Sequence, residues 1–212
     1  MEQNQDLTVQ ERLAKQEYSR QTLEQLSNEE LIALFQNDVM PAFDVLVTRF
    51  KDPLLNYIYR FVGNYDDACD ILQDTFLRVY DKKHMYKSIA KVSTWIYTIA
   101  GNLAKTTLRR PQRSRTISIT QSSDKHDEFE IPLLDGTPLP DRMSDSALKS
   151  LRIQGALMKL PPMFREAVIL RDVQDMPYEE IAELTGMPLG TIKSRINRGR
   201  QQLMELLKDI YD

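Results

Sequence analysis

Cationic and amide side chains recur on one face of a predicted helix near the end of the chain, in the segment PYEEIAELTGMPLGTIKSRINRGRQQL from Pro177 to Leu203. Hydrogen-bonding groups of these types can reach base edges in the major groove of DNA. Two further cations, Arg195 and Arg200, flank the face and suit phosphate oxygens, which position a protein without reading sequence. No acidic residue occurs from Leu184 to Met204, so charge is segregated there. The predicted base-reading residues are Lys193, Ser194, Asn197 and Arg198.

The elements that must position these side chains are two short amphipathic helices. Glu179 and Glu180 fit the first turn of the first helix, where the helix dipole favours negative charge. Gly186 suits a left-handed residue at its end, and Pro188 prevents its continuation. An apolar stripe then recurs along the second helix at Ile192, Ile196, Gly199 and Leu203. The pattern predicts a helix-turn-helix; the alternative is an ordinary basic, solvated helix.

A second basic segment runs from Lys82 to Ser123 without any Asp or Glu. It contains the predicted loop Lys83–Lys91, in which Tyr86 can stack on an unpaired base while Lys87 and Lys91 hold the backbone. The Ser88 hydroxyl can bond to a base edge. A solvated loop explains Tyr86 nearly as well.

The next predicted helix, from Ser93 to about Arg109, has an inward and an outward face. Its inward residues are Trp95, Ile96, Ile99, Ala100 and Leu103, and Trp95 fits the core better than a stacking platform. Polar and cationic groups on the other face can follow a nucleic-acid strand. The predicted outward residues are Thr98, Gly101, Asn102, Lys105 and Arg109.

The helix predicted from Asp66 to about Tyr80 presents an acidic face with one apolar residue. Its buried stripe comprises Ala68, Leu72, Phe76 and Val79. The opposite side comprises Asp70, Gln73, Asp74 and Leu77. An exposed Leu among acids suggests a docking surface, and an ordinary solvated face with one stray apolar residue fits equally well.

These patterns predict an all-α protein of two small helical domains joined by a flexible acidic linker, the second domain being the helix-turn-helix. Ser27 to Glu30 is a capping-box sequence, and Pro53 is expected to kink or break the apolar helix after Pro41. Further helices are expected at Ser146–Leu160 and Phe164–Asp172. The expected divisions are an N-terminal extension over 1–26, a first domain over 27–112, a linker over 113–145 and a second domain over 146–212.

Composition limits the possible functions. The chain has 212 residues and a net charge of -3, so nucleic-acid binding must depend on where the charges lie. Cys69 is the single cysteine, and neither His84 nor His126 has metal-ligand spacing. No apolar run reaches the roughly 20 residues that span a bilayer, and the start is no signal peptide. We expect a cytoplasmic protein without cofactor, metal or catalytic site, because no phosphate-binding glycine loop or nucleophile–base pair occurs.

Three segments together resemble a known family. The sequences DDACDILQDTFLRVY, STWIYTIAGNLAKTTLRR and PYEEIAELTGMPLGTIKSRINRGRQQL are similar, in this order, to the polymerase-binding helix, the promoter-melting helix and the minus-35 reader of an extracytoplasmic-function (group IV) sigma factor. The resemblance covers both predicted domains. It implies a bacterial transcription initiation factor with sigma regions 2 and 4, which binds core RNA polymerase and promoter DNA.

The resemblance assigns each predicted face a role. The Asp70, Gln73, Asp74 and Leu77 face corresponds to the surface that grips the coiled coil of the polymerase beta-prime subunit. The loop Lys83–Lys91 corresponds to the one that captures a flipped minus-10 base, with Asn102, Lys105 and Arg109 beside that strand. The helix face of Lys193 to Arg198 corresponds to the minus-35 reader. The resemblance also implies contact with the polymerase beta subunit and an anti-sigma factor that masks one or both domains.

The chain departs from the family pattern at five positions. The family usually has an acid where Thr106 stands, an aromatic at Val92, a Glu at Asp74, a Ser at Pro177 and an Ala at Gly199. Pro177 lacks the usual N-cap hydroxyl, a loss of about 1 kcal/mol, and Gly199 costs a helix interior about 1 kcal/mol relative to Ala. The alternative function is a stand-alone helix-turn-helix repressor or activator that binds DNA, commonly as a dimer, without polymerase.

Overall fold

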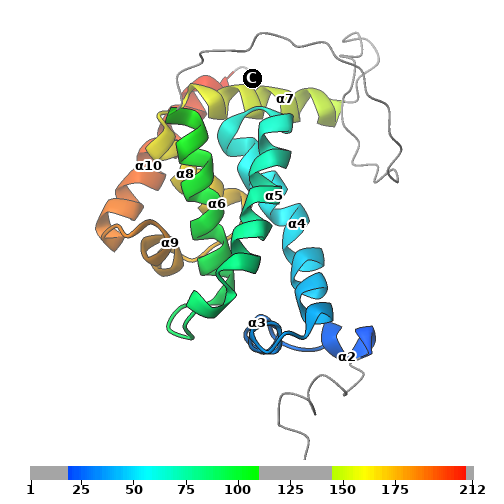
Figure 1. Ribbon diagram of the computed structural model, residues 1–212. Helices are drawn as coiled ribbons and strands as arrows, with labels where there is room; N and C mark the ends of the chain where they lie inside the picture. Colours follow the sequence, from blue (N-terminus) through cyan, green and yellow to red (C-terminus); the bar gives the residue numbers. More distant parts are fainter. Residues whose placement is uncertain (1–18, 110–144, 209–212) are drawn as a thin grey trace, which may run out of the picture.

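The computed structural model describes residues 19–109 and 145–208, and these residues form helices and their connections, with no strand among them (Figure 1). The elements of the N-terminal half are α2 (Arg20–Glu24), α3 (Asn28–Gln36), α4 (Met40–Val62), α5 (Tyr65–Asp81), the short η1 (Lys83–Met85) and α6 (Val92–Arg109). Those of the C-terminal half are α7 (Asp145–Lys159), α8 (Pro162–Val168), η3 (Ile169–Val173), α9 (Tyr178–Thr185) and α10 (Leu189–Leu206). The predicted all-α fold is confirmed.

Two predicted segments lie largely outside the described residues. Of the expected linker 113–145, the structure describes only Asp145, which begins α7. Of the expected N-terminal extension 1–26, it describes residues from Ser19 on, and these form α2, whose Leu23 is fully buried. Because α2 packs on α4, this end of the chain contributes to the hydrophobic core.

The capping box predicted at Ser27 is present at the start of α3. The Ser27 Oγ accepts a hydrogen bond from the backbone N–H of Glu30 at 3.2 Å, and the Glu30 carboxylate accepts one from the Ser27 N–H at 2.7 Å. Two of the N–H groups that a helix start leaves unpaired are thereby satisfied. The Glu30 carboxylate therefore bonds within its own helix start, and its hydrogen bonds with Ser27 lower its pKa.

Of the two outcomes expected at Pro53, a kink or a break, the break is wrong, because α4 continues through it from Met40 to Val62. Proline leaves the carbonyl four residues earlier without its helical donor. Pro53 lies on the exposed side of α4, where water can replace the lost bond. The helix ends instead at Gly63, whose φ of 80° is the left-handed conformation that glycine adopts readily.

One hydrophobic core spans both halves of the chain. Within the N-terminal half, α4, α5 and α6 pack against one another and α3 packs on α4. The C-terminal half adds Leu157, Leu160 and the run from Ala167 to Leu170 to the same cluster of buried residues. Figure 1 shows α7 crossing the end of α4, and α9 lies against α6. The two halves are therefore in close apolar contact.

No helix among the described residues is long and apolar enough to cross a membrane.

Candidate nucleic-acid interface

The helix-turn-helix geometry of α9 and α10 agrees with the sequence pattern. Gly186 ends α9 with a φ of 68°, and the following Met187 donates its N–H to the Ala182 carbonyl at 3.1 Å. Pro188 then stands immediately before α10. The predicted inward residues of α10, Ile192, Ile196 and Gly199, are buried, and Leu203 is half-buried.

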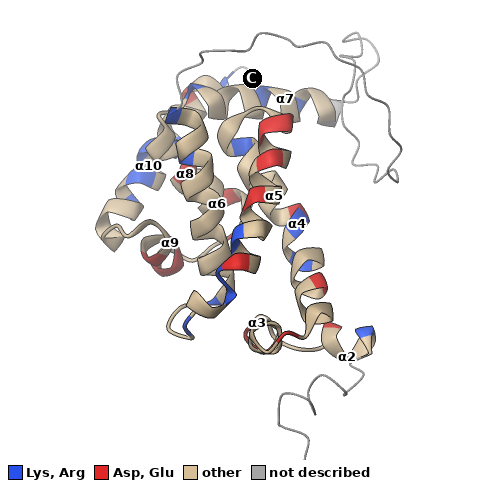
Figure 2. Cartoon of the chain, viewed as in Figure 1, with Lys and Arg blue, Asp and Glu red and all other residues tan. Residues whose placement is uncertain are grey.

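The predicted base-reading row of α10 is open to solvent. Lys193, Ser194, Asn197 and Arg198 are all exposed, and they lie opposite the buried stripe. Figure 2 shows basic positions along the outer side of α10. A helix anchored on one side and lined with donors on the other has the form that enters a major groove.

The two flanking arginines are placed differently from each other. Arg195 is half-buried, whereas Arg200 is exposed and forms a two-pronged ion pair with Asp172, its Nε lying 3.0 Å from Oδ2. This hydrogen bonding raises the pKa of Arg200, so its charge is held firmly. Phosphate binding by Arg200 requires exchange of the Asp172 carboxylate for a phosphate oxygen.

Gly199 brings α10 close to α8. A Cβ atom placed on Gly199 lies 2.5 Å from Val168 Cγ2 and 3.3 Å from the carbonyl oxygen of Phe164. Two non-bonded carbon atoms cannot lie as close as the first of these distances, so an alanine at this position would force Val168 or the backbone to shift. The small residue that weakens helix propensity here therefore permits the packing that orients α10.

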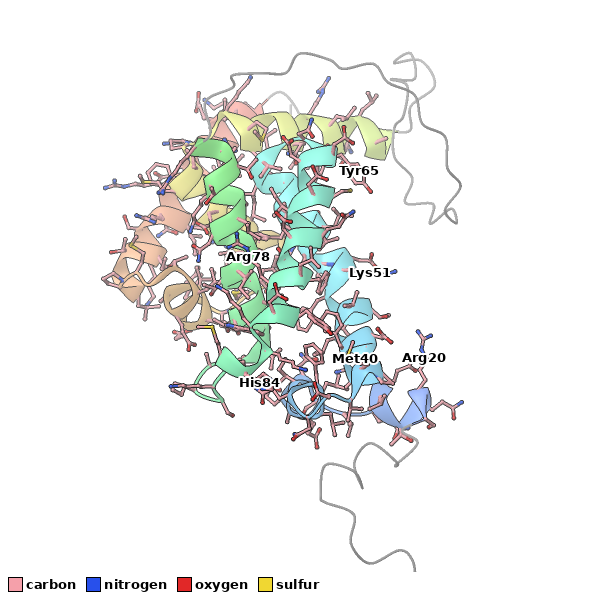
Figure 3. All side chains as sticks on the ribbon, in the orientation of Figure 1. Arg20, Met40, Lys51, Tyr65, Arg78 and His84 are labelled. Atoms are coloured by element: carbon pink, nitrogen blue, oxygen red, sulfur yellow. The ribbon has the colours of Figure 1, made fainter. Side chains whose placement is uncertain are left out.

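The basic loop Lys83–Lys91 divides into anchored and exposed residues. Lys83 is buried, with its ammonium 2.5 Å from Asp38 and 4.7 Å from the centre of the Phe35 ring. The remaining polar residues His84, Lys87, Ser88 and Lys91 are exposed, and Figure 3 labels His84 in this part of the molecule. Two apolar side chains that the sequence reading passed over, Met85 and Ile89, are also exposed, Ile89 by 88%.

Tyr86 occupies an anchored position in this loop. It is 8% exposed, its hydroxyl donates to the Ala90 carbonyl at 2.7 Å, and its ring centre lies 5.3 Å from that of Trp95. Burial raises the pKa of its hydroxyl. Stacking of this ring on an unpaired base requires the loop to release it, so the base-stacking role stays a prediction.

The face of α6 predicted to follow a nucleic-acid strand is only partly open. Asn102 and Arg109 are exposed, but Lys105 is half-buried and its ammonium lies 2.8 Å from the Glu166 carboxylate of α8. The expectation that Gly101 faces outward is wrong: it is buried, because the Tyr57 hydroxyl and Glu166 lie directly over it. Residues distant in sequence cover this part of the helix.

A second carboxylate from the C-terminal half meets the start of α6. Glu180 of α9 lies 2.9 Å from the Lys91 ammonium and accepts hydrogen bonds from the hydroxyls of Ser93 and Thr94. Burial alone raises the pKa of Glu180, but the hydrogen bonds from these partners outweigh it and lower the pKa below its usual value. The hydrogen bond and ion pair with Glu180 raise the pKa of Lys91. The contacts of Glu166 and Glu180 with α6 could not be predicted from the sequence, because no local pattern links these residues to that helix.

The predicted docking face of α5 is exposed over its whole length. Asp70, Gln73, Asp74 and Leu77 all face solvent, and Leu77 is 61% exposed. Figure 2 shows acidic positions repeated along this helix. The predicted inward residues Ala68 and Val79 are buried, while Leu72 and Phe76 are half-buried. The outward face is exposed as expected, but the buried stripe consists of Ala68, Ile71, Thr75 and Val79, so Ile71 and Thr75 take the places predicted for Leu72 and Phe76.

Both halves match described families. The family Sigma-70 region 2 matches residues 46–114, and Sigma-70, region 4 matches residues 150–203. The ECF RNA polymerase sigma factor SigE of Mycolicibacterium smegmatis is 37% identical over 168 residues, which cover 79% of this chain and 62% of that protein. The ECF RNA polymerase sigma factor SigW of Bacillus subtilis is 31% identical over 169 residues, which cover 80% of this chain and 90% of that protein.

Solved structures share the fold. The sigma factor RpoE of Bartonella quintana, in complex with the anti-sigma factor NepR, has a TM-score of 0.58 at 25% identity and is covered over 96% of its length, with 78% of this chain. CnrH, in complex with the cytosolic domain of CnrY, has a TM-score of 0.64 at 21% identity, covering 86% of this chain and 97% of that one. Region 2 precedes region 4 along the chain, and SigW of Bacillus subtilis is aligned over 90% of its length. The chain therefore belongs to the extracytoplasmic-function family of RNA polymerase sigma factors, proteins that direct promoter-specific initiation of transcription.

Proposed function

We propose that this chain binds core RNA polymerase through α5 and reads a promoter with two separate surfaces, α10 for the minus-35 element and the α6 region for the minus-10 element. The observation that carries the proposal is the exposed row of Lys193, Ser194, Asn197 and Arg198 backed by a buried apolar stripe. The buried stripe packs α10 against the rest of the protein, and the exposed row supplies hydrogen-bonding groups that can reach base edges.

Recognition of the minus-10 element uses residues around the start and outer side of α6, of which all but Lys105 are exposed. Lys87, Ser88 and Lys91 lie in the loop, and Asn102, Lys105 and Arg109 follow along the helix. Cations here hold the phosphates of an unpaired strand. An extruded base can then be trapped at the loop, which stabilises the melted promoter.

Core polymerase sets the distance and orientation between the two DNA-binding surfaces. Base contacts contribute only about 1–3 kcal/mol each, so each surface alone binds weakly. When Asp70, Gln73, Asp74 and Leu77 dock on the coiled coil of the beta-prime subunit and the beta subunit holds the second domain, the second DNA contact becomes effectively intramolecular. The chain itself performs no bond chemistry and acts where polymerase is, in the cytoplasm.

An anti-sigma factor is a further proposed partner. The structures of RpoE and CnrH were each solved in complex with another protein, the anti-sigma factor NepR and the cytosolic domain of CnrY respectively. Exposed apolar side chains on this chain, among them Leu77, Leu151 and Ile153, offer surfaces that such a partner can cover.

The test is transcription in vitro with core polymerase and a genomic promoter library. Lys193→Ala combined with Asn197→Ala removes two base-edge contacts, so we expect promoter-specific transcripts to fall by tenfold or more while binding to polymerase persists. Leu77→Ala combined with Asp74→Asn instead weakens co-migration with core polymerase. The matched control is Lys149→Ala, an exposed lysine on α7, which leaves both measurements unchanged.

Two results contradict the proposal. Undiminished promoter-specific initiation by the Lys193/Asn197 variant removes the minus-35 assignment. Tight, sequence-specific binding of the purified chain to duplex DNA, without any association with core polymerase, favours a stand-alone repressor or activator instead.

A further inference from the structure

The basic loop that precedes α6 is held at both ends by α3. At the beginning of the loop, the side-chain amide of Gln36 donates to the Lys83 carbonyl at 2.7 Å and to the Tyr86 carbonyl at 3.1 Å. Just beyond its other end, the Glu29 carboxylate in the first turn of α3 accepts the N–H of Val92 at 3.2 Å. Gln36 and Glu29 are seven residues apart, so they share one face of α3 and lie about 10 Å apart along its axis.

All three contacts involve backbone groups of the loop and its exit into α6. The Val92 N–H belongs to the first turn of α6, where no helical carbonyl is available to pair with it. Val92 is fully buried, so water is a poor substitute for the Glu29 carboxylate. Because unpaired backbone groups are costly inside a protein, loss of the Gln36 donors or of the Glu29 acceptor favours a different path of the chain.

Side-chain anchors reinforce the same path. The Lys83 ammonium lies 2.5 Å from the Asp38 carboxylate, two residues after the end of α3. The Tyr86 hydroxyl donates to the Ala90 carbonyl at 2.7 Å, so this ring is fixed by its own hydroxyl as well as by its backbone. The side chains that point away from these anchors are exposed, and they are His84, Met85, Lys87, Ser88 and Ile89.

A loop that is already ordered has an advantage in trapping a base. Fixing each residue of a free loop costs conformational entropy, and a loop that becomes ordered only on binding subtracts this cost from the binding free energy. In this chain the contacts with α3 order the loop as part of folding. The exposed side chains are therefore in place before a strand arrives.

We propose that Gln36 and Glu29 are positioning residues for minus-10 recognition, which hold the basic loop in the shape that receives an extruded base, and that Tyr86 acts in this loop as an anchor and not as a stacking surface. The inference rests on the proposed function, which assigns the loop to the minus-10 strand. Changes at these two positions of α3 slow promoter melting and leave binding to core polymerase intact.

The experiment uses variants of the full chain that remove one contact at a time. Gln36→Met keeps the length of the side chain and removes both donors. Glu29→Met removes the acceptor, whereas Glu29→Gln removes the same charge but keeps a carbonyl oxygen for the Val92 N–H. Tyr86→Phe keeps the ring and removes only the hydroxyl that bonds Ala90.

Two controls separate positioning from a general loss of stability. Leu23→Val weakens the core of the same half at a fully buried residue of α2. Gln21→Met makes the same change as Gln36→Met at an exposed glutamine of α2. Thermal unfolding of every variant shows how much stability each change removes.

Two readouts follow the loop. Amide hydrogen exchange of the chain without polymerase reports the local order of residues 83–92. The second readout uses core polymerase and a promoter that the unmodified chain selects from the genomic library, with 2-aminopurine in the minus-10 element of the non-template strand. Its fluorescence rises when the base leaves the stack. The affinity of the complex that forms before this rise is measured separately.

We expect Gln36→Met to speed exchange in residues 83–92 and to slow base extrusion by about tenfold, because two hydrogen bonds are lost. Glu29→Met should slow extrusion by about threefold or more, and Glu29→Gln should restore most of the rate. Tyr86→Phe should also slow extrusion, whereas a stacking role predicts no change because the ring is kept. Leu23→Val and Gln21→Met should keep the normal rate, and all variants should bind polymerase normally.

The inference is overturned if Gln36→Met leaves exchange in residues 83–92 unchanged, or if exchange accelerates while base extrusion is as fast as with Leu23→Val. Equal rates for Glu29→Gln and Glu29→Met remove Glu29 from the proposal, and a normal rate for Tyr86→Phe removes its anchoring role. Failure of the proposed function has a different signature. In that case the unmodified chain gives no promoter-specific rise in fluorescence, while hydrogen exchange still reports whether α3 orders the loop.

Discussion

Replacing Gly199 by Ala sets helix propensity against packing in α10. In a helix interior the change from Gly to Ala favours folding by about 1 kcal/mol. Here the new Cβ lies 2.5 Å from Val168 Cγ2 and 3.3 Å from the Phe164 carbonyl oxygen. Valine in a helix has one strongly preferred rotamer, and Val168 is only 3% exposed, so it has little room to move. Overpacking of this kind costs about 1–3 kcal/mol.

We therefore expect Gly199→Ala to give no net gain in stability and to destabilise the protein by up to about 2 kcal/mol, which lowers the melting temperature by up to about 4–8 °C. Thermal unfolding followed by circular dichroism measures this. Gly155→Ala is the control, because Gly155 lies exposed within α7 with no atom near its Cβ position, and it should gain about 0.5–1 kcal/mol from propensity alone.

A double-mutant cycle with Val168→Ala tests the cause. Removal of the two Val168 methyl groups leaves a gap that the methyl group introduced at position 199 can fill, so the double variant should be more stable than the sum of the single effects predicts. The reasoning is refuted if Gly199→Ala raises the melting temperature as Gly155→Ala does, or if the two changes at 168 and 199 are simply additive.

Two other predictions concern the contacts between the halves. Arg165→Lys should destabilise the protein by about 2–4 kcal/mol in denaturant unfolding, with exposed Arg152→Lys as control, because a lysine cannot replace the guanidinium that bonds the carbonyls of Phe61, Met158 and Leu160. The contact of Glu180 with Lys91, Ser93 and Thr94 should be lost in acid. The pKa of Glu180 is lowered from 4.5, so the contribution of this contact to stability is complete above that pH and is lost as the pH falls through the lowered value. Glu29 and Glu183 also act on Lys91, whose pKa is raised from 10.5, so the ammonium keeps its charge throughout this range. Denaturant unfolding should therefore show the unmodified chain more stable than Glu180→Gln by a constant amount between about pH 6 and 8, and this difference should disappear as the pH falls below about 4.5. A difference that is the same at every pH contradicts this.

The helices and their faces were predictable because their signals are local. The capping box at Ser27, the stop at Gly186 and the apolar stripe from Ile192 to Gly199 each depend on residues within a few turns of one helix. The exposed row on α10 follows directly from such a stripe. Sequence periodicity therefore sufficed for the fold class and for the outward side of the proposed minus-35 reader.

Contacts between the halves could not be predicted in this way. Gly101 shares a face with Asn102 and Lys105 by periodicity, yet Glu166 covers it from 65 positions further along the chain. Tyr86 lies in a polar loop, but its ring packs against Trp95. Pro53 interrupts a hydrogen-bond ladder without ending the helix, because its side of α4 faces water. In each case the surroundings, which no local pattern specifies, decide the outcome.

The contribution of α2 and α3 bears on how this protein can be divided for biochemical work. The region 2 match begins at residue 46, inside α4, yet Leu23, Leu31 and Phe35 are completely buried, and Glu29 accepts the N–H of Val92 at the first turn of α6. A fragment cut at the family boundary loses both helices that pack on the first part of α4 and the acceptor at the start of α6. An expression fragment of this half should begin at or before Ser19.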